Sequence, residues 1–161
     1  MPHRSNNPAE QFNAVEGLLT SWLKERRAVL ARYTALVVAI DDAPASAQLA
    51  RRQRELCELL VDYISAGHFE VFAELLNEAE VFGDNSDALV AGLMPDITDT
   101  TDVILAYEEK YGRGEHYPET LRRDLSALGE LLESRFVLED RLIAGLHNQH
   151  RRQLQAPAQA G

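Results

Sequence analysis

Hydrophobic residues recur every three to four positions along most of the chain, which is the period of an amphipathic helix. The residues that carry this pattern in the first segment, about 8–40, are Phe12, Val15, Leu19, Trp22, Leu23, Leu30 and Tyr33. Alternation of apolar and polar residues, which is typical of strands, is nearly absent. The pattern therefore predicts an all-α protein.

Polar breaks separate the helical stretches from one another. The sequence DDAPAS, residues 41–46, ends the first helix, and Ser46 stands where a cap of the second helix is expected. This second helix runs toward Asn77, and the turn-forming sequence FGDNSD, residues 82–87, follows it. We expect a short helix directly after this turn.

A longer helix is predicted to begin near Pro95, because proline suits a first helical turn, and to end near Tyr111. The sequence GRGEHYP, residues 112–118, then breaks the pattern. Its Pro118 lies at or near the first turn of the last long helix, which reaches about His150.

These elements predict one domain. Short connections place consecutive helices antiparallel to each other, so we expect an up-down antiparallel helical bundle of four long helices and one short extra helix. The 161 residues suffice for a single domain over 1–161 with its own core. Residues 1–7 and the low-complexity stretch 151–161 are predicted to be disordered tails.

The stretch LVDYISAGHFEVF, residues 60–72, has two distinct helical faces. Its core face, continued to both sides, consists of Leu56, Leu60, Ile64, Gly67, Val71 and Leu75. Glycine costs a helix about 1 kcal/mol relative to alanine. We therefore expect Gly67 to have a structural role, either by letting a neighbouring helix approach closely or by marking a bend.

The opposite face of this stretch mixes small residues with one acid and one aromatic residue. Its members are Asp62, Ser65, Ala66, Phe69, Ala73 and Leu76. One interpretation is a docking face with an apolar anchor and a charged neighbour. The other is that a further helical segment covers it, which would make Phe69 part of the core. His68 and Phe72 are predicted at the boundary between the two faces.

The last helix carries two charged residues inside its apolar stripe. The stripe consists of Leu125, Leu128, Leu132, Phe136, Leu142, Ile143 and Leu146. Arg135 and Glu139 lie within it at the i,i+4 spacing of a helical ion pair. We expect this pair to be structural and partly desolvated, although it could also reach across to a partner.

The net charge of the chain favours some classes of binding partner over others. The net charge is −10 and the isoelectric point is near 4.9. Such a surface repels nucleic-acid phosphates and attracts a basic protein, although it is equally explained by solubility alone. No apolar run is long enough for a membrane span, and the N-terminus lacks a signal-peptide pattern. These features predict a cytoplasmic protein without direct nucleic-acid or membrane binding.

The sequence contains few residue patterns that are typical of catalysis or of metal binding. The single cysteine, Cys57, excludes an internal disulfide and is interpreted as a buried thiol. No Glu-x-x-His motif of a di-iron bundle occurs, and the glycines form no phosphate-binding loop. His147 and His150 have a metal-compatible spacing, but they lie at an expected frayed end. We therefore predict no enzyme activity, no metal site and no cofactor.

Three stretches resemble a known family. Residues 60–72, the sequence LGELLESRFVLEDRLI at 128–143 and the sequence SWLKERRAVLARYTALV at 21–37 are similar to segments of the Rsd/AlgQ family of bacterial anti-sigma factors. The resemblance spans roughly 12–147. It implies a helical protein that binds the basic region 4 of the primary sigma factor and so favours alternative sigma factors.

Within this resemblance, the docking interpretation acquires residue roles. Asp62 is expected to pair with an arginine of region 4, and Phe69, with Ser65 and Phe72, to fill an apolar pocket beside it. Trp22, Leu23 and Arg26 are expected to line the same groove. The free protein is expected to be a monomer or a weak homodimer. The alternative function is an acidic helical adaptor that docks on a metabolic or signalling protein.

Overall fold

The computed structural model describes residues 7–42 and 47–155. Helix α1 spans Pro8–Asp42. Asn7 caps it, because its side-chain oxygen accepts a hydrogen bond of 2.9 Å from the main-chain N–H of Ala9. Pro8 fits the first helical position, where no N–H is needed.

Helix α1 is the first of four long helical rods, where a rod is one helix or several helical segments that continue one another. The second consists of α2 (Ala47–Ala66), the π-helical segment η1 (Gly67–Val71) and α3 (Phe72–Val81), which continue one another. Gly83, with a positive φ of 73°, lies in the turn that follows α3. Helix α4 (Asp87–Tyr111) is the third rod.

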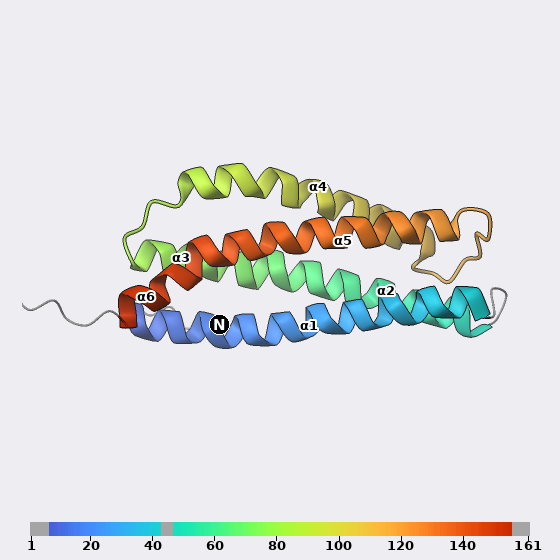
Figure 1. The fold of residues 1–161 in the computed structure, drawn as a ribbon, viewed down its shortest axis with the longest axis horizontal. Coiled ribbons are helices and arrows are strands. Elements are labelled where there is room, and N and C mark those ends of the chain that lie inside the picture. Colours follow the sequence, from blue (N-terminus) through green and yellow to red (C-terminus); the bar gives the residue numbers. More distant parts are fainter. Residues whose placement is uncertain (1–6, 43–46, 156–161) are drawn as a thin grey trace, which may run out of the picture.

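The fourth rod also contains a π-helical segment. It consists of α5 (Leu121–Ile143), η2 (Ala144–Asn148) and α6 (Gln149–Gln155). In Figure 1 the four rods lie side by side, and each runs back along the rod before it. The described residues contain no strand, so the all-α class and the four long helices are confirmed.

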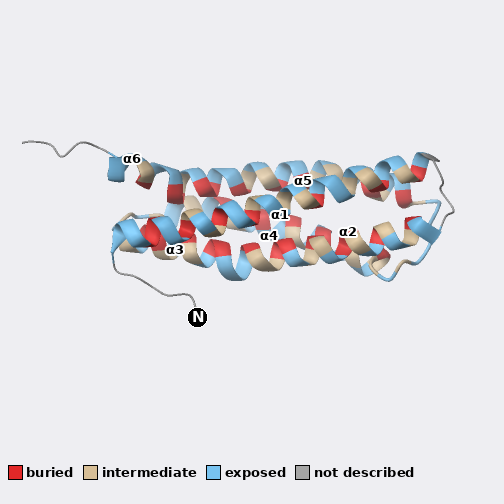
Figure 2. Cartoon of the chain, turned by 90° about the horizontal axis from the view of Figure 1, so that it is seen from below, coloured by how far each residue is buried: buried red, intermediate tan, exposed pale blue. Residues whose placement is uncertain are grey.

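The core lies along the inward faces of the four rods, as the buried positions in Figure 2 show. All six residues assigned to the core face around 56–75 are buried, which confirms that assignment. No helix within residues 7–42 and 47–155 combines the length and the apolar character that crossing a membrane requires.

Two sequence-based boundaries need correction. The prediction of a separate short helix before Pro95 was wrong, because α4 is continuous from Asp87 and contains Pro95 in its interior. Leu93 and Ile97, on either side of the proline, are both buried, and this packing outweighs the missing N–H. Residues 151–155 are helical and not a disordered tail. The predicted cap Ser46 and the tails 1–6 and 156–161 lie outside the described residues.

Candidate partner-docking site

The outward face of α2 and η1 carries three of the predicted docking residues. Phe69 is 76% exposed, Asp62 is exposed, and Ser65 is half-buried. No other described segment covers Phe69, so the alternative in which it belongs to the core is wrong. Asp62 forms no ion pair with any residue that the structure describes, which leaves its carboxylate free for a partner.

Gly67 explains how this face is supported from inside. A Cβ atom at this position would lie 2.7 Å from Cζ2 of Trp22, which is too close for any side chain. The glycine therefore lets the indole ring of α1 pack directly against the first turn of η1. The packing role predicted for Gly67 agrees with this contact.

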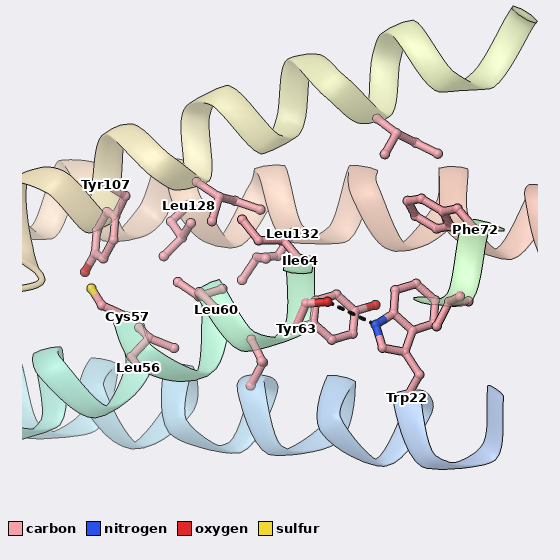
Figure 3. Packing of buried hydrophobic residues seen from close by; sticks show 14 of the residues in the cluster. Trp22, Leu56, Cys57, Leu60, Tyr63, Ile64, Phe72, Tyr107, Leu128 and Leu132 are labelled. Atoms are coloured by element: carbon pink, nitrogen blue, oxygen red, sulfur yellow. Dashed lines mark hydrogen bonds between the residues drawn. The ribbon is translucent and has the colours of Figure 1, made fainter. Parts of the chain in front are cut away.

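Trp22 and Phe72 do not lie on the docking face. Trp22 is 2% exposed and Phe72 is 4% exposed, so the predictions that both contact a partner are wrong. The indole Nε1 donates a hydrogen bond of 3.1 Å to the main-chain oxygen of Tyr63 (Figure 3). The indole ring also stacks on the Tyr63 ring with centroids 4.8 Å apart. Buried indoles need such a partner for their N–H.

Leu23 and Arg26 point toward α5 and not toward the face of Phe69. Leu23 is half-buried and lines a cleft of about 310 Å³ between α1 and the fourth rod. Arg26 donates to Asp140 at 2.7 Å and to Glu139 at 3.1 Å, and its side chain is only 13% exposed. The single groove predicted from the sequence is therefore divided between two sides of α1.

Acidic side chains from three rods surround the exposed face. Burial, followed by the charges of Asp62 and Glu70, raises the pKa of Glu25 above its ordinary value. The negative charges of Asp62 and Glu70 thus disfavour the ionised form of Glu25 on α1. A groove of about 390 Å³ beside Asp62 adds Glu58 and Glu108. None of these further acids was predicted to lie at the docking face, because a helical wheel does not show that α1 or α4 packs next to α2.

The predicted Arg135–Glu139 pair is present and buried. Arg135 Nε donates to Glu139 at 2.9 Å, and the two side chains are 1% and 0% exposed. Burial and the charge of Glu139 raise the pKa of Tyr63, so its hydroxyl keeps its proton and donates to Glu139 at 2.5 Å. Arg135 also donates to the hydroxyls of Thr100 and Thr101 on α4. The pair thus joins the rods to each other.

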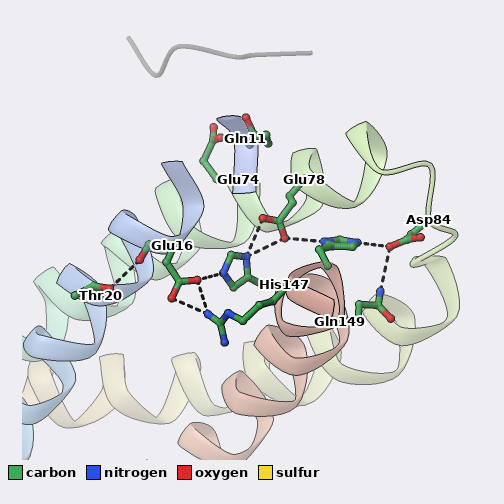
Figure 4. A network of polar contacts seen from close by, with 10 residues as sticks. Gln11, Glu16, Thr20, Glu74, Glu78, Asp84, His147 and Gln149 are labelled. Carbon is green, nitrogen blue, oxygen red and sulfur yellow. Dashed lines mark hydrogen bonds and ion pairs between the residues drawn. The ribbon is translucent and has the colours of Figure 1, made fainter. Parts of the chain in front are cut away.

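A second buried polar network was missed by the sequence analysis (Figure 4). His147 and His150 are 1% and 0% exposed and do not lie at a frayed end. Both contact Glu78 of α3, which is itself fully buried. The described residues contain no group of three or more His, Cys, Asp or Glu side chains placed to hold a metal ion. The only signal in the sequence was the pair of histidines within an apolar helical pattern.

Cys57 is buried, as predicted. Burial, with the charges of Glu108 and Glu58 adding to it, raises the pKa of its thiol to about 12. A thiol held in its protonated form is a poor nucleophile. Cys57 is therefore unsuited to nucleophilic catalysis.

The fold and the exposed face define an all-helical protein with one aromatic side chain displayed on an acidic surface. An exposed aromatic side chain with charged neighbours is common at protein interfaces. The chain belongs to the Rsd/AlgQ family: residues 1–147 match the family described as "Regulator of RNA polymerase sigma(70) subunit, Rsd/AlgQ". This is a family of sigma-factor regulators and not a family of enzymes. The resemblance stated from the sequence is confirmed.

Two relatives illustrate the similarity. The chain is 29% identical over 147 residues to "Regulator of sigma D" of Yersinia pseudotuberculosis serotype O:1b (strain IP 31758), which covers 89% of this chain and 87% of the relative. It is 32% identical over 148 residues to the protein of that name from Shigella boydii serotype 4 (strain Sb227), covering 89% and 92%. None of the solved structures compared with the chain matches it significantly.

Proposed function

We propose that this chain is an anti-sigma factor that binds region 4 of the primary sigma factor and sequesters it. The family description and the names of the relatives point to a sigma factor as the regulated protein. The observation that carries the proposal is Phe69, which is 76% exposed beside Asp62, Glu25 and Glu70, acids that form no ion pair within the described part of the chain. An aromatic anchor with charged neighbours is a common energetic centre of protein interfaces.

Charge supports a basic partner. Region 4 is expected to be a basic helix-turn-helix module, and this chain carries a net charge of −10. Opposite charges on two proteins accelerate their encounter and fix their relative orientation. In this arrangement Asp62 pairs with an arginine of region 4, Ser65 lies at the edge of the contact, and Glu25 and Glu70 strengthen the local field.

The mechanism is competition and needs no catalytic residue. Sigma region 4 that is bound to this chain is removed from the pool available to core RNA polymerase and promoter DNA. Alternative sigma factors then bind a larger share of the core polymerase. This role places the protein in the cytoplasm with the polymerase. An up-down bundle suits it, because its rigid rods hold Asp62 and Phe69 in fixed positions.

Calorimetric titration with isolated region 4 of the host's primary sigma factor tests the proposal. The unmodified chain is expected to form a saturable complex. Phe69→Ala and Asp62→Ala are each expected to weaken it by about 30-fold or more, which corresponds to roughly 2 kcal/mol. Both side chains are exposed, so the thermal stability of the chain should change little.

Two residues on α5 provide matched controls. Glu133 is an exposed acid without an ion pair in the described residues, and Val137 is 48% exposed. Glu133→Ala and Val137→Ala should change the affinity by less than about threefold. Absence of a complex with the unmodified chain would reject region 4 as the partner. Equal weakening by all four variants would reject the face around Phe69.

A further inference from the structure

The C-terminal segment is held to the rest of the molecule by a chain of alternating carboxylates and imidazoles (Figure 4). His147 of η2 contacts Glu16 of α1 at 2.5 Å through Nε2 and Glu78 of α3 at 2.8 Å through Nδ1. His150 of α6 contacts Glu78 at 2.9 Å through Nδ1, and its Nε2 contacts Asp84. All four imidazole nitrogens therefore face a carboxylate.

The protons needed for these contacts can be counted. An ionised carboxylate only accepts hydrogen bonds, and a neutral imidazole has a single N–H. Four contacts between imidazole nitrogens and carboxylate oxygens need four protons, whereas two neutral histidines supply two. The folded chain must therefore hold two protons more than neutral histidines and ionised carboxylates provide.

We propose that these two protons make His147 and His150 imidazolium ions and that they form a latch, which fastens residues 144–155 to α1 and α3 and opens when the protons are lost. Buried Glu78 lies at its centre, with a positive charge on either side. Once the histidines are neutral, two of the four contacts place a nitrogen lone pair against a carboxylate oxygen. Such a contact is repulsive, and most strongly so at Glu78, whose side chain is fully buried.

The surroundings of the latch favour protonation. Among the residues that the structure describes, Arg151 of α6 is the arginine that contacts the network, and it is paired with Glu16, whose two oxygens each lie 2.7 Å from its Nη2. Asp140 of α5 lines the same cleft as His147. From α3, Glu74 bonds to Gln11 of α1. From α4, the uncharged Leu89 lies against Gly145.

Two aromatic rings cover the imidazoles. Phe12 stacks on His147 with centroids 4.3 Å apart, and Phe82 stacks on His150 at 3.9 Å. An aromatic face carries negative charge density and therefore attracts an imidazolium more strongly than a neutral imidazole. Opening of the latch would uncover Phe12 and widen the cleft that Leu23 lines.

The direction of the pH dependence follows from His147. Burial, which is the largest single influence, would lower its pKa, but the hydrogen bonds and charges of Glu78 and Glu16 outweigh it and raise the pKa. A folded pKa above the unfolded value means that the stabilisation is complete below about pH 6.5. It is lost as the pH rises through the folded pKa. Between the unfolded and the folded pKa, the unfolding constant rises about tenfold per pH unit for each proton that the folded chain binds in excess of the unfolded chain.

NMR of the imidazole nitrogens in the unmodified chain counts the protons directly. Both nitrogens of His147 and of His150 are expected to carry hydrogen at neutral pH. Hydrogen exchange of the amides of 144–155 should accelerate with pH more steeply than exchange in the core of α5. A neutral tautomer at either histidine, or equal pH dependence in both regions, would overturn the latch.

Denaturation at a series of pH values tests its contribution to stability. Above about pH 7 the unfolding constant of the unmodified chain should rise by about tenfold or more per pH unit, and that of His147→Gln should rise less steeply. His116→Gln is the matched control, because His116 is exposed and outside the network. The same slope in His147→Gln as in the unmodified chain would contradict the proposal. If His147→Gln does not fold, the NMR proton count decides.

Discussion

Replacing Glu139 by glutamine tests whether the buried charge cluster stabilises the fold. The change removes one negative charge and nearly preserves the shape of the side chain. It leaves the guanidinium of Arg135, which is 1% exposed, without its carboxylate. Glutamine also brings an NH₂ group toward Arg135, Tyr63 or Arg26, which are all donors.

The expected loss follows from the contacts of Glu139. Its carboxylate accepts hydrogen bonds from Arg135 at 2.9 Å, Tyr63 at 2.5 Å and Arg26 at 3.1 Å. Removing one partner of a buried pair typically costs about 3–5 kcal/mol, because a charge is left uncompensated. For a chain of this size, that loss lowers the melting temperature by roughly 6–20 °C.

Urea unfolding followed by far-UV circular dichroism measures the change in unfolding free energy. Asp140→Asn is the matched control, since Asp140 binds the same Arg26 at 2.7 Å but its side chain is 60% exposed. An exposed pair contributes about 1 kcal/mol or less. The two variants remove the same charge from adjacent positions, so their difference measures the combined effect of burial and of the additional donors, Arg135 and Tyr63, that contact Glu139.

A loss below about 1 kcal/mol in Glu139→Gln, equal to that of Asp140→Asn, would refute this reasoning. It would mean that the site relaxes or admits water when the charge is removed. The double variant Arg135→Met with Glu139→Leu adds a further check. It should cost less than the sum of its single changes, because no unpaired charge remains between these two positions.

Two further predictions concern packing. Gly67→Ala should lower the unfolding free energy by about 1 kcal/mol, because overpacking against Trp22 costs about 1–3 kcal/mol and outweighs the helix-propensity gain of about 1 kcal/mol. Gly92→Ala, where a Cβ meets nothing within 4 Å, should instead stabilise the chain; destabilisation by both would show that the space at Gly67 is not the cause. Cys57, whose pKa burial raises to about 12, should react with a disulfide reagent only after unfolding, and rapid labelling of the native chain would contradict its burial.

Much of the candidate site could be predicted from the sequence, because the relevant information lies within one helix. The period of apolar residues separates the buried face of Leu60 and Ile64 from the exposed face of Asp62 and Phe69. The i,i+4 spacing likewise places Arg135 beside Glu139. Such inferences need only the geometry of a helix, which is the same in every protein.

The predictions from the sequence were wrong for residues whose burial depends on contacts between helices. Trp22 was expected in the groove from the family resemblance, yet it is buried, because the missing side chain of Gly67 leaves room for its ring. Phe72 was placed at a boundary from an ideal rotation of about 100° per residue. The π-helical segment Gly67–Val71 changes that rotation directly before it, and the ring of Phe72 turns inward.

The sequence by itself determined the all-helical fold, the four long helices and the acidic charge. Each depends on residues near one another in the chain or on composition alone. Only the tertiary structure decided the partners of buried polar groups. Glu78 and His147 are separated by 69 positions, and no local pattern relates them. They meet because a buried carboxylate requires a donor, and only the packing of the rods determines which donor lies within reach.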